Sequence, residues 1–168
     1  MALPKKHYEN EKRLAAIALL HEITNIYVGF YGSNGFGQIQ NTLVASSDPH
    51  FRLEKVLIRV WHKKDAVFNY HSKEWEESDW EEKDLPLEEF LTHHVDFALM
   101  DTGVDWYNDV GGSGFWEWDP QNSLEFIIQV RYPNTIFVRI EARKLGSPKL
   151  ATREPFAGRM SSMRSELE

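Results

Sequence analysis

The residues best suited to chemistry lie in one stretch, DWYNDVGGSGFWEWD, which covers residues 105–119. It holds three tryptophans, a Gly-Gly pair and four acidic residues. Carboxylate and amide oxygens beside aromatic rings, on a loop that glycines hold open, are typical of a ligand site. This interpretation predicts a set of ligand-binding residues: Asp105, Trp106, Tyr107, Asn108, Asp109, Gly111 and Gly112.

The same stretch also has a purely structural interpretation. Asn108 and Asp109 favour Asx turns, and the glycine pair can take positive φ on entry to a strand. The oxygens of Asp105, Asn108 and Asp109 would suit a hard cation, but Tyr107 and Val110 break the spacing of an EF-hand loop. We therefore predict no metal ligand and no cofactor, and the structural interpretation is favoured over ligand binding.

A second glycine-rich loop, GSNGFG, covers residues 32–37. Its G-x-x-G-x-G spacing, without a following Lys-Ser/Thr or helix, does not match a phosphate-binding loop, so a hairpin turn is favoured. If its strands neighbour those around Gly111 and Gly112, the two loops line one edge of a sheet. Asn34 and Gly35 would then join the predicted ligand site.

Histidines give a weaker candidate at His93, His94 and Asp96. Adjacent histidines cannot supply the i, i+4 spacing of a two-histidine metal site on a helix. His94 falls on the apolar face of its predicted helix, which favours a core histidine, and His93 follows Glu89 by four positions, an ordinary helix pair.

The segment EWEESDWEEKD, residues 74–84, holds seven acidic residues and one lysine. We predict an exposed loop, which is either a solvated surface or a binding site for a basic partner, most simply another protein. The partner-binding candidates are Glu74, Trp75, Glu76, Glu77, Asp79, Trp80, Glu81 and Glu82.

Two helices are predicted to position these loops. Residues 8–22 form the first, because one face of a 3.6-residue repeat carries Leu14, Ile17, Ala18 and His21. Asp84 is the predicted N-cap of the second, which runs over residues 85–101 with Gly103 as its C-cap. The apolar face of this second helix consists of Leu87, Phe90, Leu91, His94, Val95 and Ala98.

Alternating apolar residues predict the strands. The first runs over residues 23–31, with Ile26, Val28 and Phe30 on one face. Others are predicted at residues 38–45, 53–61, 67–70, 115–118, 124–131 and 135–143. Short connections favour antiparallel pairing. The expected fold is a single α+β domain over residues 1–146, ordered helix–strands–helix–three strands, with both helices on one face of the sheet. Residues 147–168 are expected to be a loosely ordered basic tail.

Composition narrows the classes of protein. The chain has 168 residues and no cysteine, which excludes disulfide scaffolds, cysteine-ligated metal sites and thiol nucleophiles. A formal net charge of −7 makes general nucleic-acid binding unfavourable. The N-terminus lacks the apolar region of a signal peptide, and no run approaches the roughly 20 apolar residues of a membrane span. We expect a cytoplasmic protein without membrane contact.

Two short sequence motifs resemble those of a known protein family. The first is Gly35, Gly37, Gln38 and Ile39, and the second is Trp106, Asn108, Asp109, Gly111, Gly112 and Gly114. With the surrounding pattern of residues 17–143, they resemble a family of uncharacterised bacterial proteins, a domain of unknown function often encoded near plasmid or phage genes. Val110 departs from the family pattern, which usually reads straight into glycine. The resemblance implies no known activity.

Three classes of function remain. The favoured one is a non-catalytic accessory or protein-interaction domain of a bacterial or mobile-element system, which uses the acidic, aromatic-containing surface. The second is a small-molecule or ion-binding domain with its site at the two glycine loops. The third is an enzyme with a carboxylate pair, Asp105 or Asp109 with Glu117, which would require a raised carboxylate pKa in a cleft.

Overall fold

The structure is a computed structural model that describes residues 5–64, 67–76, 79–103, 105–133, 138–146 and 150–153. The described part forms one α+β domain with antiparallel sheets, as predicted. Its elements are, in order, α1 (Lys5–Leu20), β1 (Ile23–Ser33), β2 (Phe36–Ser46), the 3-10 turn η1 (Leu53–Lys55), β3 (Leu57–Lys63), β4 (Val67–Asn69), β5 (Glu74–Glu76), β6 (Trp80–Pro86), α2 (Leu87–Thr102), β7 (Gly112–Trp118), β8 (Glu125–Arg131), β9 (Val138–Lys144) and β10 (Leu150–Arg153).

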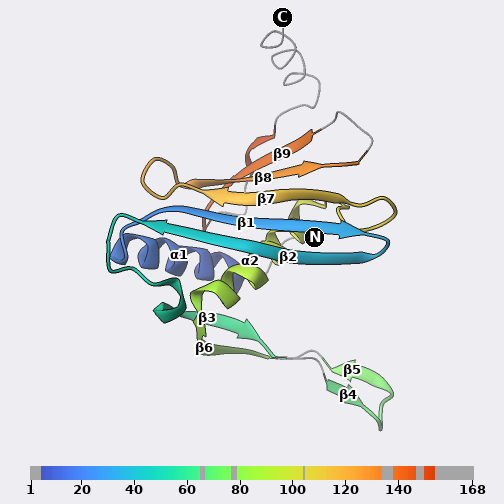
Figure 1. Ribbon diagram of the computed structural model, residues 1–168. Helices are drawn as coiled ribbons and strands as arrows, with labels where there is room; N and C mark the ends of the chain where they lie inside the picture. The colour runs from blue at the N-terminus through green and yellow to red at the C-terminus, as the bar shows by residue number, and fades with distance from the viewer. Residues whose placement is uncertain are drawn as a thin grey trace, which may run out of the picture.

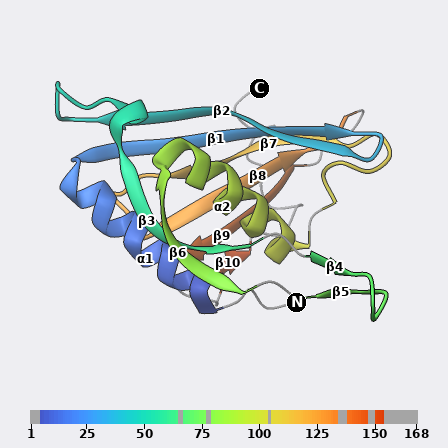
Figure 2. The same cartoon turned by 90° about the horizontal axis from the view of Figure 1, so that it is seen from below.

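Six strands form the main sheet in the order β10-β9-β8-β7-β1-β2. Both helices lie on one face of this sheet, as predicted, and Figure 1 shows them beneath it. Strands β3 and β6 pair antiparallel into a separate two-stranded sheet, here called the ribbon, on the far side of the helices. Figure 2 shows the ribbon crossing in front of α1 and α2. The helices are therefore enclosed between two β layers.

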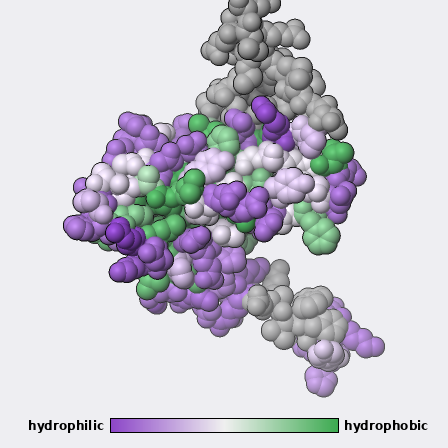
Figure 3. Space-filling model, in the orientation of Figure 1, coloured by the Kyte–Doolittle hydropathy of each residue, from purple (hydrophilic) through white to green (hydrophobic). Residues whose placement is uncertain are grey.

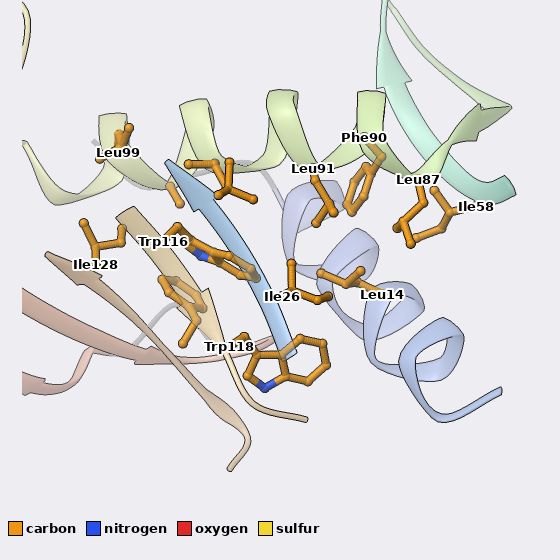
Figure 4. Close-up of a cluster of buried hydrophobic side chains, with 14 of the residues drawn as sticks. Leu14, Ile26, Ile58, Leu87, Phe90, Leu91, Leu99, Trp116, Trp118 and Ile128 are labelled. Carbon is orange, nitrogen blue, oxygen red and sulfur yellow. The ribbon is translucent and has the colours of Figure 1, made fainter. Parts of the chain in front are cut away.

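The core lies between the main sheet and the helices (Figure 4). The inward residues of β1 are buried as their alternation predicted, and Val28 pairs with Trp116 of β7, which pairs with Ile128 of β8. Rows of large side chains across three strands give the sheet an apolar face that the helices must cover. Leu14 of α1 and Leu91 of α2 are fully buried against it.

Helix α2 shows how a local pattern can be right while the helix start is wrong. The predicted apolar face is buried, and Gly103 is the C-cap with φ of 67°. The predicted N-cap at Asp84 is wrong, because β6 continues to Pro86, which occupies the N-cap position itself. The first helical amide, that of Leu87, donates to the carbonyl of Val56 at 2.9 Å, so a backbone carbonyl next to η1 satisfies this amide in place of a side chain.

The prediction of an exposed loop over residues 74–84 is also wrong. Residues 74–76 form β5, and residues 80–86 form β6 of the ribbon. Leu85 of β6 is buried with Ile58 and Val60 of β3, so one face of the ribbon packs on the helices, while Glu82 and Asp84 lie on the opposite face of β6. Strands β4 and β5 form an arm that stands clear of the body in Figure 3.

The remaining differences concern element ends. Helix α1 begins earlier than predicted, and Glu22, with φ of 51°, turns the chain into β1. Where a strand was predicted over residues 53–61, the chain begins with the 3-10 turn η1, and strand β3 starts at Leu57. In the segment expected to be a loose tail, residues 150–153 form the edge strand β10 against β9. Residues 147–149 and 154–168 lie outside the described residues.

Candidate functional site

The two glycine loops do meet at one edge of the main sheet, as the sequence suggested. The amide of Asn34 donates to the carbonyl of Asp109 at 2.9 Å, and the amide of Gly35 donates to the carbonyl of Tyr107 at 2.7 Å. These bonds continue the pairing of β1 with β7 beyond Gly32 and Gly112. The predicted ligand residues from both loops are therefore neighbours.

The two loops are in close backbone contact. A Cβ on Gly32 would lie 2.6 Å from the carbonyl oxygen of Trp106, and one on Gly111 would overlap the carbonyl of Gly32. The ring of Trp106 is 4% exposed and packs edge-on against Phe30, with ring centroids 5.2 Å apart. Glycine at these positions allows the two backbones to approach each other and the Trp106 ring closely.

Polar side chains of the second loop support its turn. Asp105 Oδ1 accepts from the amide of Asn108 at 3.1 Å, and Oδ2 accepts from the Asn108 side chain at 3.2 Å. An Asx-type bond was predicted for this turn at Asn108 and Asp109, but the side chain that accepts the backbone amide is that of Asp105. Glu117, the proposed partner carboxylate, accepts instead from Asn25 Nδ2 at 3.0 Å. The carboxylate pair required for the enzyme hypothesis is not assembled by these contacts.

Acidic residues of the ribbon face cations from neighbouring elements. Glu82 lies 2.6 Å from Arg13 of α1, and Glu81 lies 3.7 Å from Lys64. Arg59 of β3 lies 3.6 Å from Asp84. These side chains are partly exposed, so the pairs contribute little stability, but they lower the negative charge that the ribbon presents.

The other predicted partner residues are dispersed. Glu74, the first residue of β5, and Asp79, directly before β6, are both exposed. The side chains of Trp75 and Glu76, and the whole of Glu77, lie outside the described residues. Trp80 is half-buried and faces a cavity described below.

A buried ionisable cluster, which the sequence analysis did not identify, lies between the helices and the main sheet. Glu11 of α1 is fully buried, and its Oε1 lies 2.6 Å from Nη2 of Arg143 on β9, which is 2% exposed. His7 Nε2 lies 3.8 Å from Glu11 Oε1, and His94 Nε2 lies 4.0 Å from Glu11 Oε2. The two imidazole rings stack with centroids 4.8 Å apart and an angle of 9°.

Burial controls the protonation of this cluster. It raises the pKa of Glu11 from 4.5 to about 7, although the Arg143 guanidinium acts in the opposite direction. Burial lowers the pKa of His7 to about 3 and that of His94 well below its usual range, with a further contribution from the positive charge of Arg143. Both imidazoles are therefore neutral at physiological pH, and each carries one donor and one acceptor nitrogen.

Ring nitrogens of these histidines are unusual for buried polar atoms. Within the described ranges, neither Nδ1 nor Nε2 of His94 has a hydrogen-bond partner, and neither does Nε2 of His7. The great majority of buried polar side-chain atoms are hydrogen-bonded, since burying one without a partner costs roughly 1–3 kcal/mol. The sequence predicted that His94 is a buried histidine with hydrogen-bonded nitrogens. It is buried, but its nitrogens have no hydrogen-bond partner among the described residues.

Next to the stacked rings, a cavity of about 180 Å³ opens between α1, α2 and the ribbon. We call it the four-histidine cavity, because His7, His62, His93 and His94 all line it. The aromatic side chains on its walls are Trp61, Trp80, Phe90 and Phe97, and the remaining lining residues are Asn10, Val60, Lys63 and Leu85. The elements that enclose it are seen together in Figure 2.

Histidines enter this cavity from three elements. His93 is half exposed and lies 3.9 Å from Glu89, the helix pair that the sequence predicted. Its ring meets that of His62 on β3 edge-on, with centroids 5.7 Å apart. His93 and His62 therefore form the outer wall, while the buried rings of His7 and His94 form the inner wall.

A second, wider groove of about 570 Å³ lies at the end of α1, beside Trp118 and the β7–β8 turn. Its walls are mostly apolar, with exposed Leu19 and Leu124, and Glu22 is the ionisable residue among its lining. It brings together fewer groups capable of chemistry than the four-histidine cavity does.

Comparison with protein-family models, with curated proteins and with solved structures finds no match to this chain. In the ranges that the structure describes, no group of three or more His, Asp or Glu side chains is placed to hold a metal ion. None of the described helices is long and apolar enough to cross a membrane.

A sequence signal for the buried cluster did exist. His7, Glu11, Leu14 and Ala18 lie at positions i, i+4, i+7 and i+11, so all four share the buried face of α1. The predicted face began at Leu14, and charged residues such as Glu11 are rarely fully buried. The partner that makes Glu11 tolerable, Arg143, lies near the other end of the described chain and gives no local signal.

Proposed function

We propose that this protein is a small-molecule-binding domain whose ligand occupies the four-histidine cavity. The observation that carries the proposal is a cavity of about 180 Å³ whose wall brings together four histidines and four other aromatic side chains. Ligand sites typically combine apolar and aromatic walls with a few placed polar groups. The proposal favours this cavity over the glycine loops, because the backbones of those loops and the ring of Trp106 are in close contact.

A fragment screen by ligand-observed NMR tests this proposal. His93→Trp would obstruct the outer wall of the cavity from a half-exposed position without changing the core. His50→Trp is the matched control, because His50 is an exposed histidine that does not line the cavity. We expect fragments that bind the wild type to bind His50→Trp equally and His93→Trp at least tenfold more weakly. Equal binding to all three proteins, or no binding to any, would contradict the proposal.

A second candidate is the accessory or protein-interaction role that the sequence favoured. The arm supports it, because Tyr70 at its tip is 85% exposed beside the exposed Glu74, and the arm extends away from the body (Figure 1). Exposed aromatic residues with charged neighbours are common in protein interfaces. A role in a bacterial or mobile-element system, as the resemblance implies, belongs to this candidate.

Affinity capture with and without the arm tests the second candidate. A partner that wild type retains from host lysate, and that is lost when residues 65–78 are removed, would support it. Neutralisation of Glu81 and Glu82 on the ribbon is the comparison. If a partner is lost on that neutralisation but retained without the arm, the ribbon rather than the arm is the binding surface.

A further inference from the structure

We propose that strand β2 is a dimerisation edge, along which two copies of this chain pair antiparallel about a two-fold axis. β2 is the last strand of the main sheet and, among the described strands, it pairs with β1 alone. Figure 2 shows it as the outermost strand on its side of the sheet. The dimer would join two main sheets into one. No residue of β2 lines the four-histidine cavity, so this inference is independent of the proposed function.

The backbone of β2 presents hydrogen-bonding groups along this edge. In a strand, the amide and carbonyl groups of successive residues point to opposite sides. The amide of Ser47, directly after β2, donates to the carbonyl of Glu22 at 3.0 Å and therefore points toward β1. By this alternation, the amides of Thr42, Val44 and Ser46 point away from β1. No described strand pairs with them on that side.

Most of the features by which edge strands avoid association are missing from β2. Such strands are commonly very short, or they carry charged side chains, proline or a bulge. β2 has 11 residues, and none of them is Asp, Glu, Lys, Arg or Pro. Its one extra residue against β1 is Asn41, with φ of 60°. Beyond this bulge, residues 42–46 form an uninterrupted run that is free to pair.

Charge indicates that the partner strand comes from a second copy. The chain has a formal net charge of −7, so two copies repel each other unless they meet at an uncharged surface. Residues 36–46 carry no charge, and two copies can approach along β2 without like charges facing each other. A charged strand of another protein gains no ion pair from β2 itself.

The side chains of residues 42–46 suit pairing with themselves. With the two-fold axis at Val44, this residue faces its own counterpart. Leu43 then faces Ala45 of the second copy, and Thr42 faces Ser46. Leu43 is 64% exposed in the single chain, on the sheet face away from the helices, so the pairing covers it. Apolar pairs and Thr–Ser pairs across strands both stabilise a sheet.

Two-fold symmetry limits the assembly to two copies. An interface in which β2 meets β2 uses the same strand of both chains, so no free β2 edge remains after pairing. The opposite edge of the main sheet is β10, which has only four residues. We therefore expect a closed dimer and not a longer polymer.

Analytical ultracentrifugation at micromolar to millimolar concentrations tests the proposal. Leu43→Lys places a positive charge on each copy at the pairing edge, where like charges across strands are unfavourable. We expect the wild type to form dimers and Leu43→Lys to raise the dimer dissociation constant at least tenfold. Ile127→Lys is the matched control. Ile127 is 43% exposed in the same row of the same sheet face, but β8 has neighbours on both sides, so this variant should dimerise like the wild type.

Hydrogen exchange of single amides, followed by NMR, tests the edge directly and needs no variant. The amides of Thr42 and Val44 should exchange more slowly as the concentration of wild type rises, because dimer formation pairs them. The amides of Leu43 and Ala45 point toward β1, so their exchange should not depend on concentration in this way. If Leu43→Lys does not fold, this alternation in the wild type decides the proposal.

Three results would overturn the inference. The first is a wild type that remains monomeric at millimolar concentration. The second is a dimer that Ile127→Lys dissociates and Leu43→Lys does not, because the interface would then be the open face of the sheet. The third is a dimer without the alternating exchange in β2. None of these results bears on ligand binding in the four-histidine cavity.

Discussion

Glu11 is the residue whose protonation should be visible in the stability of the protein. Its native pKa of about 7 lies above the unfolded value of 4.5, so between these pH values the native state holds a proton that the unfolded state has released. The stability associated with this proton is fully present below pH 4.5 and is lost as the pH rises through about 7. His7 and His94 act in the opposite sense, because their stability is present above 6.5 and is lost on acidification.

Glu11→Gln should isolate this contribution. We expect the difference in unfolding free energy, wild type minus variant, to fall by on the order of 3 kcal/mol between pH 4.5 and pH 7.5. Urea denaturation at a series of pH values measures it. Glu74→Gln, at an exposed position on β5, is the control substitution. A flat profile for Glu11→Gln would mean that Arg143 keeps this carboxylate ionised throughout.

Substitutions at Gly111 and Gly35 distinguish two effects of an added side chain on stability: strain from a positive φ and a clash with neighbouring backbone. Both have positive φ, but a Cβ on Gly35 meets nothing within 4 Å, whereas one on Gly111 overlaps the backbone of Gly32. Gly35→Ala should cost about 1–2 kcal/mol, the usual penalty for this conformation. Gly111→Ala should cost several kcal/mol more, because the loops must separate. Equal thermal midpoints for the two variants would contradict the packed structure of the loops.

At the scale of elements, the arm is a separable addition to the ribbon. The amide of Lys64 donates to the carbonyl of Asp79 at 3.1 Å, which closes the ribbon before the arm begins. Replacement of residues 65–78 by Asn-Gly, a sequence suited to a two-residue hairpin turn, should change the unfolding free energy by less than about 1 kcal/mol.

A longer replacement, of residues 63–80, is the comparison for this prediction. It also removes Trp80 from the wall of the four-histidine cavity, so we expect it to be clearly more destabilising and to weaken ligand binding. If both replacements destabilise the protein equally, as measured by chemical denaturation, the arm packs on the body more closely than the described contacts indicate.

How far sequence predicts structure differs between these elements. The alternation in β1 and the apolar stripe of α2 are local patterns, and both buried faces were predicted from them. Strand β6 was missed because its composition is dominated by acids. Its extended form depends on β3, which supplies Arg59 as a charge partner and Ile58 as a packing partner. The loops were predicted to meet, but the ring of Trp106 that fills the space between them was not.

In the whole molecule, the two β layers should differ in stability. Strands β1, β7 and β8 have neighbours on both sides in the main sheet, whereas β3 and β6 pair with each other. Amides of β3 and β6 should therefore exchange with solvent through openings of lower free energy than amides of the central strands. Hydrogen exchange followed by mass spectrometry measures this, and a ligand in the cavity should selectively slow exchange in the ribbon. Uniform exchange in both layers would show that the domain opens as one unit.

The tryptophans fall into two groups that should differ in fluorescence, because they differ in burial. Of the five indoles whose side chains the structure describes, Trp106, Trp116 and Trp118 are buried, while Trp61 and Trp80 are half-buried on the cavity wall. An indole in apolar surroundings emits at shorter wavelengths than one in contact with water. The long-wavelength emission of these five therefore comes from the wall where a ligand would displace water. Lys6, whose Nζ lies 4.0 Å from the centre of the Trp61 ring, makes that emission sensitive to any movement of α1 against the ribbon.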